Sequence, residues 1–532
     1  MSWVVVGSGA SAVHFAQTAL ERGERVVLVD VGREGPAPVR PEDGFEDLKR
    51  NLEDPVAHLL GERFEAVTYP GGDGEYYGFP PNKAFVFEGV DGFDVRPNGF
   101  APLLSFARGG LAEAWTGGSF PFSRAELGGF PFAPDDLAAH YDLVAARIGI
   151  TGEDDDLAPH VPVHAGLLPP LPLDEHSRRL LERYRSHRDR VRALGAALGR
   201  SRVAVLPEDR NGRSGCRLLG RCLLGCPIDS LWTPSVTLRE LQGRPGFEYR
   251  PGRRVTRLDV DSARRVTGVV AAKLDGSGEE TIPAERVALA AGTLASTKIF
   301  LETWRRATGE KPRLPGLMDN RQVLMPFLNW SMIGERHDPR TYQYHQIALA
   351  LAEDDPTQTI HGLVTTLKTA SVHPVVQGVP LDVRTALRVF RSVHAALGLV
   401  NVNFPDTRRD DCWVGLDPAA GDGESPLLVR YAPPAGEAAR IRSVTSRVCR
   451  VLRELGCFVP PRMSHVRPMG ASVHYAGTIP MTREERPFTA TPGGASRDVA
   501  GLWFADGATF PVLPAKNLTF TLMANASRIA AA

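Results

Sequence analysis

A strand, a glycine-rich turn and a helix open the chain, and this feature most constrains how it can fold. The apolar run Trp3 to Val6 leads directly into GSGASA at positions 7–12, which matches the pattern G-x-G-x-x-G/A. An amphipathic segment follows as far as Gly23, and RVVLVD then reads as a second strand that ends at Asp30. Because this second strand is apolar throughout, we expect it to be buried on both faces in a parallel sheet.

The residues of this βαβ unit have separate uses in a dinucleotide site. Gly7 permits the tight turn, Gly9 lets the backbone approach a pyrophosphate, and Ala12 lets the helix pack close to the strand. The helix N-terminus supplies amide donors and the positive end of a dipole to the phosphates. Asp30 can accept hydrogen bonds from ribose hydroxyls and disfavours a 2′-phosphate, which favours FAD or NAD over NADP. The cofactor-binding residues predicted here are Gly7, Ser8, Gly9, Ser11, Ala12 and Asp30. A glycine turn in a nucleotide-free α/β domain is the alternative.

Length and charge narrow the class of protein. The chain has 532 residues, which exceeds a simple NAD dehydrogenase and suits a flavoprotein that carries this unit at its N-terminus. Sixty-two basic residues balance sixty-two acidic ones, so net charge gives no reason to expect binding to nucleic acid or to an anionic membrane. Neither a secretory signal nor an apolar run of transmembrane length is recognisable, so we expect a cytoplasmic protein.

Four later segments extend the interpretation. They are RGGLAEAWTGG from Arg108, VALAAGTLASTKIF from Val287, HYAGTIPM from His474, and the closing stretch ADGATFPVLPAKNLTFTLMANASRIA from Ala505. With the N-terminal turn, their order and rough spacing resemble those of the glucose–methanol–choline (GMC) oxidoreductase family. The resemblance covers about a third of the chain directly and implies an FAD-dependent enzyme that oxidises an alcohol to a carbonyl.

Alcohol oxidation by hydride transfer needs a hydride acceptor, a base for the hydroxyl proton and a donor that holds the alcohol oxygen. An imidazole can accept a proton near neutral pH, which makes His474 the candidate base, and the Asn517 amide can donate to the same oxygen. The resemblance places these two residues at the family's catalytic positions, facing flavin N5. A core histidine and a helix cap are the structural alternatives for His474 and Asn517.

The resemblance also implies further flavin contacts. Asp506 would bond the ribityl or pyrophosphate part, and the start of the last helix would stabilise reduced flavin through its dipole. The remaining expected cofactor-binding residues are Gly109, Gly110, Trp115, Val255, Ala291, Gly292, Gly507, Leu518 and Thr519. Because Ala114, and not a histidine, precedes Trp115, we expect non-covalent FAD.

Departures from the family pattern leave the alcohol and the electron acceptor open. Ala12 replaces the third glycine, Asp30 the usual Glu, and Leu518 rather than Pro follows Asn517. The partners expected are a small alcohol (a sugar, polyol or glycoside) and dioxygen or another electron carrier. A flavin-containing lyase of the same fold, and a dehydrogenase acting on a non-sugar alcohol, are the alternatives.

Three cysteines lie close together in the sequence. Cys216, Cys222 and Cys226 have the spacing C-x5-C-x3-C, which lacks the paired C-x2-C blocks of a zinc site. We predict no metal here and leave the role of the three cysteines open. The segment resembles a cysteine-rich region of sugar-acid and long-chain alcohol dehydrogenases in the same superfamily.

The fold class predicted is α/β with two interleaved domains. An FAD-binding Rossmann-like domain, a parallel sheet plus a β-meander, is assigned residues 1–125, 205–318 and 464–532. Residues 126–204 and 319–463 are assigned to an α+β substrate-binding domain built on an antiparallel sheet, because strand-like runs alternate there with polar loops. His345 and His361 lie in its strand-like runs as possible pocket residues, although a structural role is the stronger expectation.

Overall fold

A computed structural model of the protein contains a five-stranded parallel sheet. The structure describes residues 2–66, 79–366, 381–421 and 423–532. The strand order is β22-β11-β1-β2-β7, and every neighbouring pair is parallel. The strands are β1 (Ser2–Val6), β2 (Arg25–Val29), β7 (Phe247–Arg250), β11 (Val287–Leu289) and β22 (Leu502–Phe504). This sheet therefore assembles both ends and the middle of the sequence, as predicted.

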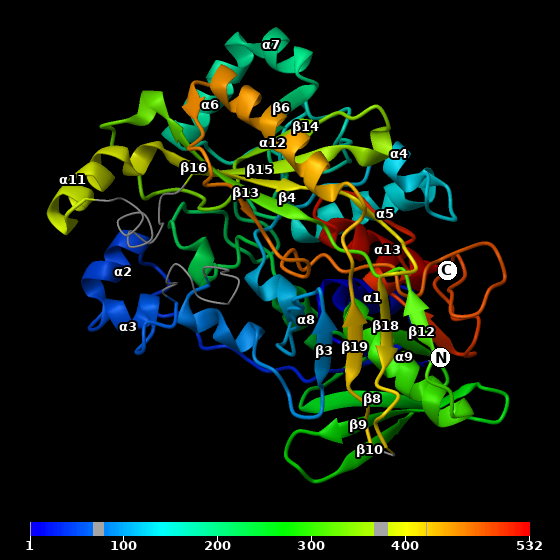
Figure 1. Cartoon of the computed structure of the whole chain (residues 1–532). Helices are drawn as coiled ribbons and strands as arrows, with labels where there is room; N and C mark the ends of the chain where they lie inside the picture. The colour runs from blue at the N-terminus through cyan, green and yellow to red at the C-terminus, as the bar shows by residue number, and fades with distance from the viewer. Residues whose placement is uncertain (1, 67–78, 367–380, 422) are drawn as a thin grey trace.

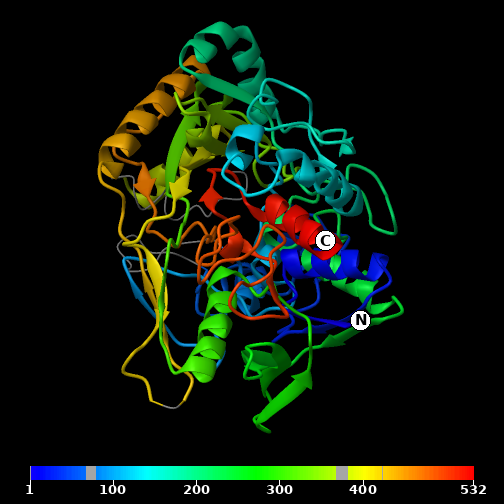
Figure 2. The same ribbon diagram turned by 90° about the vertical axis from the view of Figure 1, so that its right-hand side faces the viewer.

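Helices from opposite ends of the chain cover this sheet. Helix α1 (Ala10–Glu21) packs against α13 (Thr519–Ala531), and Figures 1 and 2 show the two side by side. Helix α5 (Pro134–Ile148) packs in turn on α13. Its buried side chains, among them Leu137 and Val144, belong to the same apolar core as β1 and α1. Although α5 lies in a segment assigned to the substrate-binding domain, it therefore contributes to the core of the nucleotide part; the domain boundaries stay a prediction.

The expected β-meander follows β7. Strands β8 (Arg253–Val260), β9 (Val266–Lys273) and β10 (Glu279–Pro283) form an antiparallel sheet in the order β10-β9-β8. The chain then returns through β11 to α9 (Thr293–Thr308), which packs on β8. Gly292, with φ +89°, forms the turn between β11 and α9.

A larger antiparallel sheet lies above the parallel one in Figure 1. Its order is β20-β13-β16-β15-β14-β6, with β21 also paired to β13. The strands are β6 (Ala196–Arg200), β13 (Gln322–Asn329), β14 (Ile347–Leu351), β15 (Ile360–Thr366), β16 (Leu397–Asn403), β20 (Cys457–Phe458) and β21 (His465–Val466).

The two faces of this sheet differ in what they meet. Helices α6 (Glu175–Ser186), α7 (Arg188–Ala193) and α12 (Glu437–Glu454) cover one face. Alternation along β13 sends Val323, Met325 and Phe327 into that helical layer. Gln322 and Leu324 point the other way, into a cavity between the two parts of the molecule. The α/β fold class with an antiparallel sheet carrying helices on one side is thus confirmed.

Smaller elements complete the fold. A four-stranded sheet has the order β12-β18-β19-β3, and two short pairs join β17 to β23 and β4 to β5. These strands are β3 (Val95–Asn98), β4 (Ile150–Thr151), β5 (Leu167–Leu168), β12 (Arg313–Pro315), β17 (Asp406–Thr407), β18 (Trp413–Leu416), β19 (Leu427–Arg430) and β23 (Val512–Leu513). The other α-helices of the described residues are α2 (Phe45–Asn51), α3 (Pro55–Leu60), α4 (Arg124–Leu127), α8 (Pro234–Gln242) and α11 (Val383–Val393).

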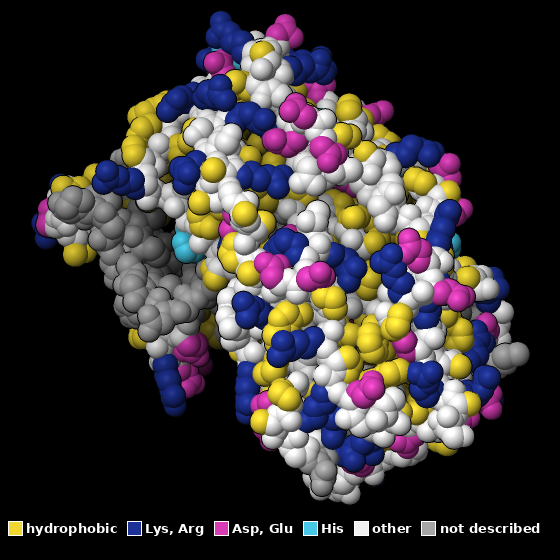
Figure 3. All heavy atoms as spheres, turned by 45° about the vertical axis from the view of Figure 1, so that its right-hand side comes forward, with side chains coloured by type: hydrophobic (Ala, Val, Ile, Leu, Met, Phe, Trp, Pro, Cys, Tyr) yellow, Lys and Arg dark blue, Asp and Glu magenta, His cyan; other side chains and the backbone are white. Residues whose placement is uncertain are grey.

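The surface carries both signs of charge. Figure 3 shows Lys and Arg side chains intermingled with Asp and Glu over the visible face, in keeping with the balanced net charge. Within the described part of the chain, every helix is too short or too polar to cross a bilayer.

Candidate active site

One cavity of about 920 Å³ collects the residues that the sequence singled out. It opens where β1, β2 and β11 end, and the antiparallel sheet bounds its far side. This is the place where open parallel sheets bind ligands. All the predicted cofactor-binding and catalytic residues line it except Ala12, which is fully buried inside α1. The position of Ala12 agrees with the packing use expected of it.

The glycine turn after β1 is as tight as the sequence predicts. Gly7 has φ +100°, and its amide donates to Val29 O over 2.8 Å. A Cβ at this position would lie 2.7 Å from Ala290 O, so both the conformation and the contact require glycine. Helix α1 begins at Ala10, and its first amides therefore point toward the cavity where a phosphate can accept from them.

Ser8 connects this turn to two other parts of the site. Its hydroxyl donates to Asp30 Oδ2 and accepts from the Gly109 amide over 2.8 Å. Burial raises the pKa of Asp30 to about 6, against the opposing effects of hydrogen bonds from Ser8 and Tyr249. The Asp30 carboxyl thus stands at the end of β2 with hydrogen-bonding capacity left for a ribose.

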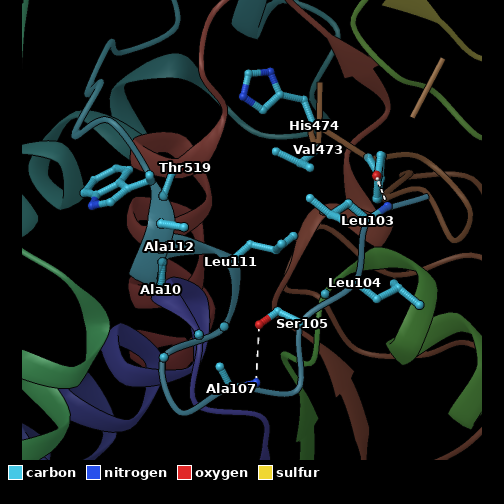
Figure 4. A pocket seen from close by; sticks show the side chains of 18 of the residues that line it. Ala10, Leu103, Leu104, Ser105, Ala107, Leu111, Ala112, Val473, His474 and Thr519 are labelled. Atoms are coloured by element: carbon cyan, nitrogen blue, oxygen red, sulfur yellow. Dashed lines mark hydrogen bonds between the residues drawn. The ribbon is translucent and has the colours of Figure 1, made fainter. Parts of the chain in front are cut away.

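The glycine-rich loop expected to contact the flavin faces the N-terminal turn. Gly109 and Gly110 have positive φ, and a Cβ at Gly110 would lie 3.5 Å from the Gly9 Cα. Trp115 lines the cavity and is held by its indole N–H, which donates to Trp232 O over 2.7 Å. Figure 4 shows Leu111 and Ala112 of this loop beside Ala10 and opposite Leu103 and Leu104.

Asp506 organises the other glycine turn. Its Oδ2 accepts from the Gly292 amide over 3.0 Å and from Ser296 Oγ over 2.5 Å, while Oδ1 accepts from the Ala508 amide over 3.0 Å. Burial raises the pKa of Asp506 to about 6. A carboxylate offers about four acceptor positions. Two of them join the end of β22 to the β11–α9 turn, and a third caps the turn that Asp506 itself begins. Val255, Ala291, Gly507, Leu518 and Thr519 line the cavity around this junction.

His474 lies at the other end of the cavity, as Figure 4 shows. Its Nδ1 is 2.9 Å from Asn320 Oδ1, and its backbone amide donates to Ser472 Oγ over 2.9 Å. Burial, reinforced by the nearby Arg467 guanidinium, lowers the pKa of His474 to about 4. The imidazole is therefore neutral at pH 7 and able to accept a proton.

Asn517 lines the same end of the cavity, just before α13 begins. Its Oδ1 is buried and has no hydrogen-bond partner among the described residues. A Cβ on Gly118 would lie 3.2 Å from this oxygen and 3.3 Å from His345 Nε2, so the glycine leaves room for both side chains. The structure thus brings His474 and Asn517 to one cavity, with no direct hydrogen bond between the two described side chains.

Of the two other histidines considered from the sequence, only one reaches the cavity. His345 lines it, with Nε2 3.1 Å from Thr116 Oγ1 and Nδ1 3.0 Å from Ser201 Oγ. Burial lowers its pKa to about 3. His361 is buried behind the cavity wall, with its ring edge-to-face against Phe120 at 4.5 Å between centroids, which is the structural role expected of it.

Prediction from the sequence missed the polar side chains that point from the antiparallel sheet into the cavity. Gln322, Asn401 and Thr365 line the cavity together with Leu324, Leu363 and Leu399. It also missed Asn320, the partner of His474. The polar residues could have been noticed as interruptions of apolar strands, but which face each one takes depends on strand register.

The three clustered cysteines lie outside the cavity wall. Cys216, Cys222 and Cys226 are free thiols that pack beside Tyr342 and Tyr344. Burial raises the pKa of Cys216 to about 11, so this thiol is protonated at neutral pH. Among the residues that the structure describes, no group of three or more His, Cys, Asp and Glu side chains has an arrangement that could hold a metal ion.

Comparison with known proteins finds relatives of this chain. Residues 462–526, which carry His474 and Asn517, match the model of the GMC oxidoreductase family. A 6'''-hydroxyparomomycin C oxidase of Streptomyces lividus is 22% identical over 98% of this chain and 89% of its own. A paromamine 6'-oxidase of Streptomyces fradiae is 25% identical over 56% of this chain and 49% of its own.

The chain is similar to a divergent member of the GMC oxidoreductase family. Its fold agrees with solved structures at low identity. A pyridoxine 4-oxidase from Mesorbium loti has a TM-score of 0.59 at 14% identity and matches 99% of this chain and 98% of its own. An FAD-dependent oxidoreductase from Chaetomium thermophilum has a TM-score of 0.59 at 12% identity, again over 99% and 98% of the two chains. Together these similarities show an FAD-dependent enzyme that acts on alcohols.

The residues around the cavity fit FAD. The Gly7 turn leaves no space for a Cβ, the amides of α1 face the cavity, and Asp30 ends β2 with acceptor capacity for a ribose. At the catalytic end, the buried Asn517 Oδ1 has no hydrogen-bond partner among the described residues, and a bound molecule can supply one. Binding is non-covalent, in keeping with Ala114, whose methyl group cannot form a bond to the flavin.

Proposed function

We propose that this enzyme oxidises a hydroxyl group of a small polyhydroxylated molecule (a sugar, polyol or glycoside) to a carbonyl. The observation that carries the proposal is the pairing of His474 and Asn517 at one end of the FAD cavity, where His474 is buried and neutral. Two relatives are named as oxidases of paromamine and of 6'''-hydroxyparomomycin C, and these names support a polyhydroxylated substrate.

Each side chain has one task in this reaction. Bound FAD supplies the acceptor for the hydride that leaves the alcohol carbon. His474 takes the hydroxyl proton, which it can do because burial keeps its ring neutral. Asn517 holds the alcohol oxygen through its amide and so fixes the carbon toward the flavin. Leucines of β13, β15 and β16 make part of the surrounding wall apolar.

The cavity wall supports a polyhydroxylated substrate. Asn401 lies in register between Leu324 of β13 and Leu363 of β15, so one amide stands in an apolar surface. Its Oδ1 is buried with no partner among the described residues, and an unpaired buried oxygen costs about 1–3 kcal/mol. A substrate that offers a second hydroxyl group can relieve that cost.

Anaerobic mixing of the FAD-loaded enzyme with a library of sugars, polyols and other alcohols tests the proposal. Bleaching of the flavin absorbance with formation of a carbonyl product is the expected result. A carbonyl product without bleaching would instead indicate the lyase reaction of the same fold. If only alcohols without further hydroxyl groups bleach the flavin, the substrate class is wrong. Repeating the turnover with dioxygen and with artificial carriers then identifies the electron acceptor.

A further inference from the structure

We propose that Asn320, supported by Asp319, is a positioning residue that makes His474 a base through one nitrogen only. Asn320 orients the imidazole so that Nδ1 carries the proton and Nε2 keeps the lone pair for the alcohol. The inference rests on the proposed function for its catalytic consequence, but the geometry of the two side chains stands without it.

The hydrogen bonds of Asn320 determine the direction of its amide. Its Nδ2 donates to Phe404 O over 2.8 Å and to Pro514 O over 3.1 Å, and the side chain is buried. Carbonyl oxygens only accept, so both amide hydrogens are committed to them and the amide cannot be flipped. Oδ1 must therefore face His474, and an oxygen acceptor at 2.9 Å requires a proton on His474 Nδ1.

The neutral ring has only one proton, so its other nitrogen is bare. His474 lines the cavity, and none of the hydrogen bonds found among the described residues involves Nε2. Nε2 is thus the atom available to an alcohol. This is the logic by which a buried partner on one imidazole nitrogen selects the basic nitrogen of a catalytic histidine.

The same side chain joins the two proposed catalytic residues. Phe404 follows β16, and Pro514 lies three residues before Asn517. By donating to both carbonyls, Asn320 ties the end of the antiparallel sheet and the segment that leads to Asn517 to the ring of His474. A small shift of any one of them would disturb the others, and catalytic geometry tolerates little misplacement.

Asp319 holds the backbone beneath the ring. Its carboxylate accepts from the Gly470 amide over 2.5 Å and from the Ser472 hydroxyl, and Ser472 Oγ accepts from the His474 amide over 2.9 Å. Val473, between these residues, has φ +59°, an uncommon conformation for a β-branched residue. Such strain persists where the surroundings over-determine it, and it marks segments held for function. Neighbouring residues 319 and 320 therefore fix the backbone and the ring of one histidine.

The first experiment observes the tautomer directly and needs no substrate. Protein labelled with ¹⁵N in histidine is examined by NMR at pH 7, and the His474→Gln variant identifies the signal of His474 among the fourteen histidines. We expect one protonated nitrogen, Nδ1, and one bare nitrogen, Nε2. The Asn320→Leu variant should give a mixture of both tautomers. A wild-type ring protonated at Nε2 would overturn the proposal.

The second experiment separates positioning from a purely structural contribution. In Asn320→Asp a carboxylate still accepts from Nδ1–H and stabilises the imidazolium, so the NMR titration of His474 should move upward by at least one pH unit. The rate of flavin reduction by the best alcohol should then fall at acidic pH, and the midpoint of this fall should match the raised pKa of His474. In Asn320→Leu we expect the flavin-reduction rate constant to fall about 10- to 100-fold. Removing the hydrogen-bond partner of a metal-ligating histidine has an effect of this size in other proteins.

Asn329→Ala is the matched control. Asn329 is also a buried asparagine at the other end of β13, where its Oδ1 accepts from the Ser331 amide and hydroxyl, and it does not line the cavity. It should cost stability while leaving the His474 titration and tautomer unchanged. If the control and Asn320→Leu change the spectrum of His474 equally, the positioning role is refuted. If no alcohol bleaches the flavin but the tautomer is as expected, the proposed function fails and the inference about Asn320 survives.

Discussion

The two ends of the FAD cavity are built in different ways. The nucleotide end comes from one stretch of sequence, Gly7 to Asp30, and depends on backbone conformation, because a Cβ at Gly7 would meet Ala290 O at 2.7 Å. The catalytic end brings together Asn320, Asn401, His474 and Asn517 from distant segments. There the important hydrogen bonds are made by side chains, to other side chains and to distant backbone carbonyls.

Burial acts on ionisable groups at both ends, with opposite chemical results. At the nucleotide end it raises the pKa values of Asp30 and Asp506 to about 6, which brings their titration close to neutral pH. At the catalytic end it lowers the pKa of His474 to about 4, which keeps a base unprotonated. The nucleotide end therefore depends on a fixed backbone geometry, whereas the catalytic end depends on the protonation state of one side chain. Mutations at the two ends should therefore separate cofactor binding from chemistry.

The largest effect should come from His474→Gln. Glutamine keeps a polar side chain of similar reach but cannot accept the alcohol proton, so the flavin-reduction rate constant should fall about 10²- to 10⁴-fold. FAD content, read from the absorbance ratio of the purified protein, should stay at the wild-type value. Wild-type reduction rates in this variant would show that another group is the base. Loss of FAD would show that the two ends are not separable.

Gly7→Ala should have the opposite pattern. The substitution forces a Cβ into Ala290 O and an alanine into φ +100°, at a cost of about 1–3 kcal/mol. FAD affinity should fall roughly 5- to 150-fold, and thermal stability should fall as well. The flavin-reduction rate constant per bound flavin should stay at the wild-type value. Gly23→Ala is the matched control, because Gly23 also has positive φ (+79°) but no atom within 4 Å of its Cβ position. Equal FAD loss in both variants would refute the close-approach argument.

The two ends also differ in how far the sequence predicts them. Gly7, Ser8 and Asp30 belong to one local pattern, and the structure places them together at the ends of β1 and β2. His474 and Asn517 were found through family resemblance. Nothing in the sequence pointed to Asn320 or Asn401, because their importance depends on the register of β13, β15 and β16 and on a carbonyl of the distant Pro514. Contacts of this range follow from tertiary packing, which local patterns do not encode.

Asn401→Leu should change selectivity more than catalysis. It replaces the one amide between Leu324 and Leu363 by an apolar side chain, so kcat/KM for a polyhydroxylated alcohol should fall about tenfold. An apolar alcohol that offers no second hydroxyl group should lose nothing or gain slightly, and it serves as the internal control. Equal losses for both alcohols would mean that Asn401 supports the fold of the sheet and not the recognition of substrate.

The smallest effect concerns pH and contrasts the two ends in one protein. His474 has a pKa of about 4, so its neutral form dominates above that value, and the flavin-reduction rate should change less than twofold between pH 5.5 and 8. An acidic limb near pH 6.5 would show that His474 is solvated like an ordinary histidine.

At the nucleotide end, thermal stability should depend on pH within the same range. The pKa of Asp30 is raised to about 6, so its contribution to the stability of FAD-free protein is present at low pH and is lost as the pH rises through 6. The melting temperature of FAD-free Asp30→Asn minus that of FAD-free wild type should therefore increase from pH 5 to pH 7, because asparagine has no proton to lose. If the difference between the two proteins does not vary with pH, Asp30 is ionised throughout, and the contrast between a carboxyl that titrates near pH 6 at one end and a neutral base at the other is wrong.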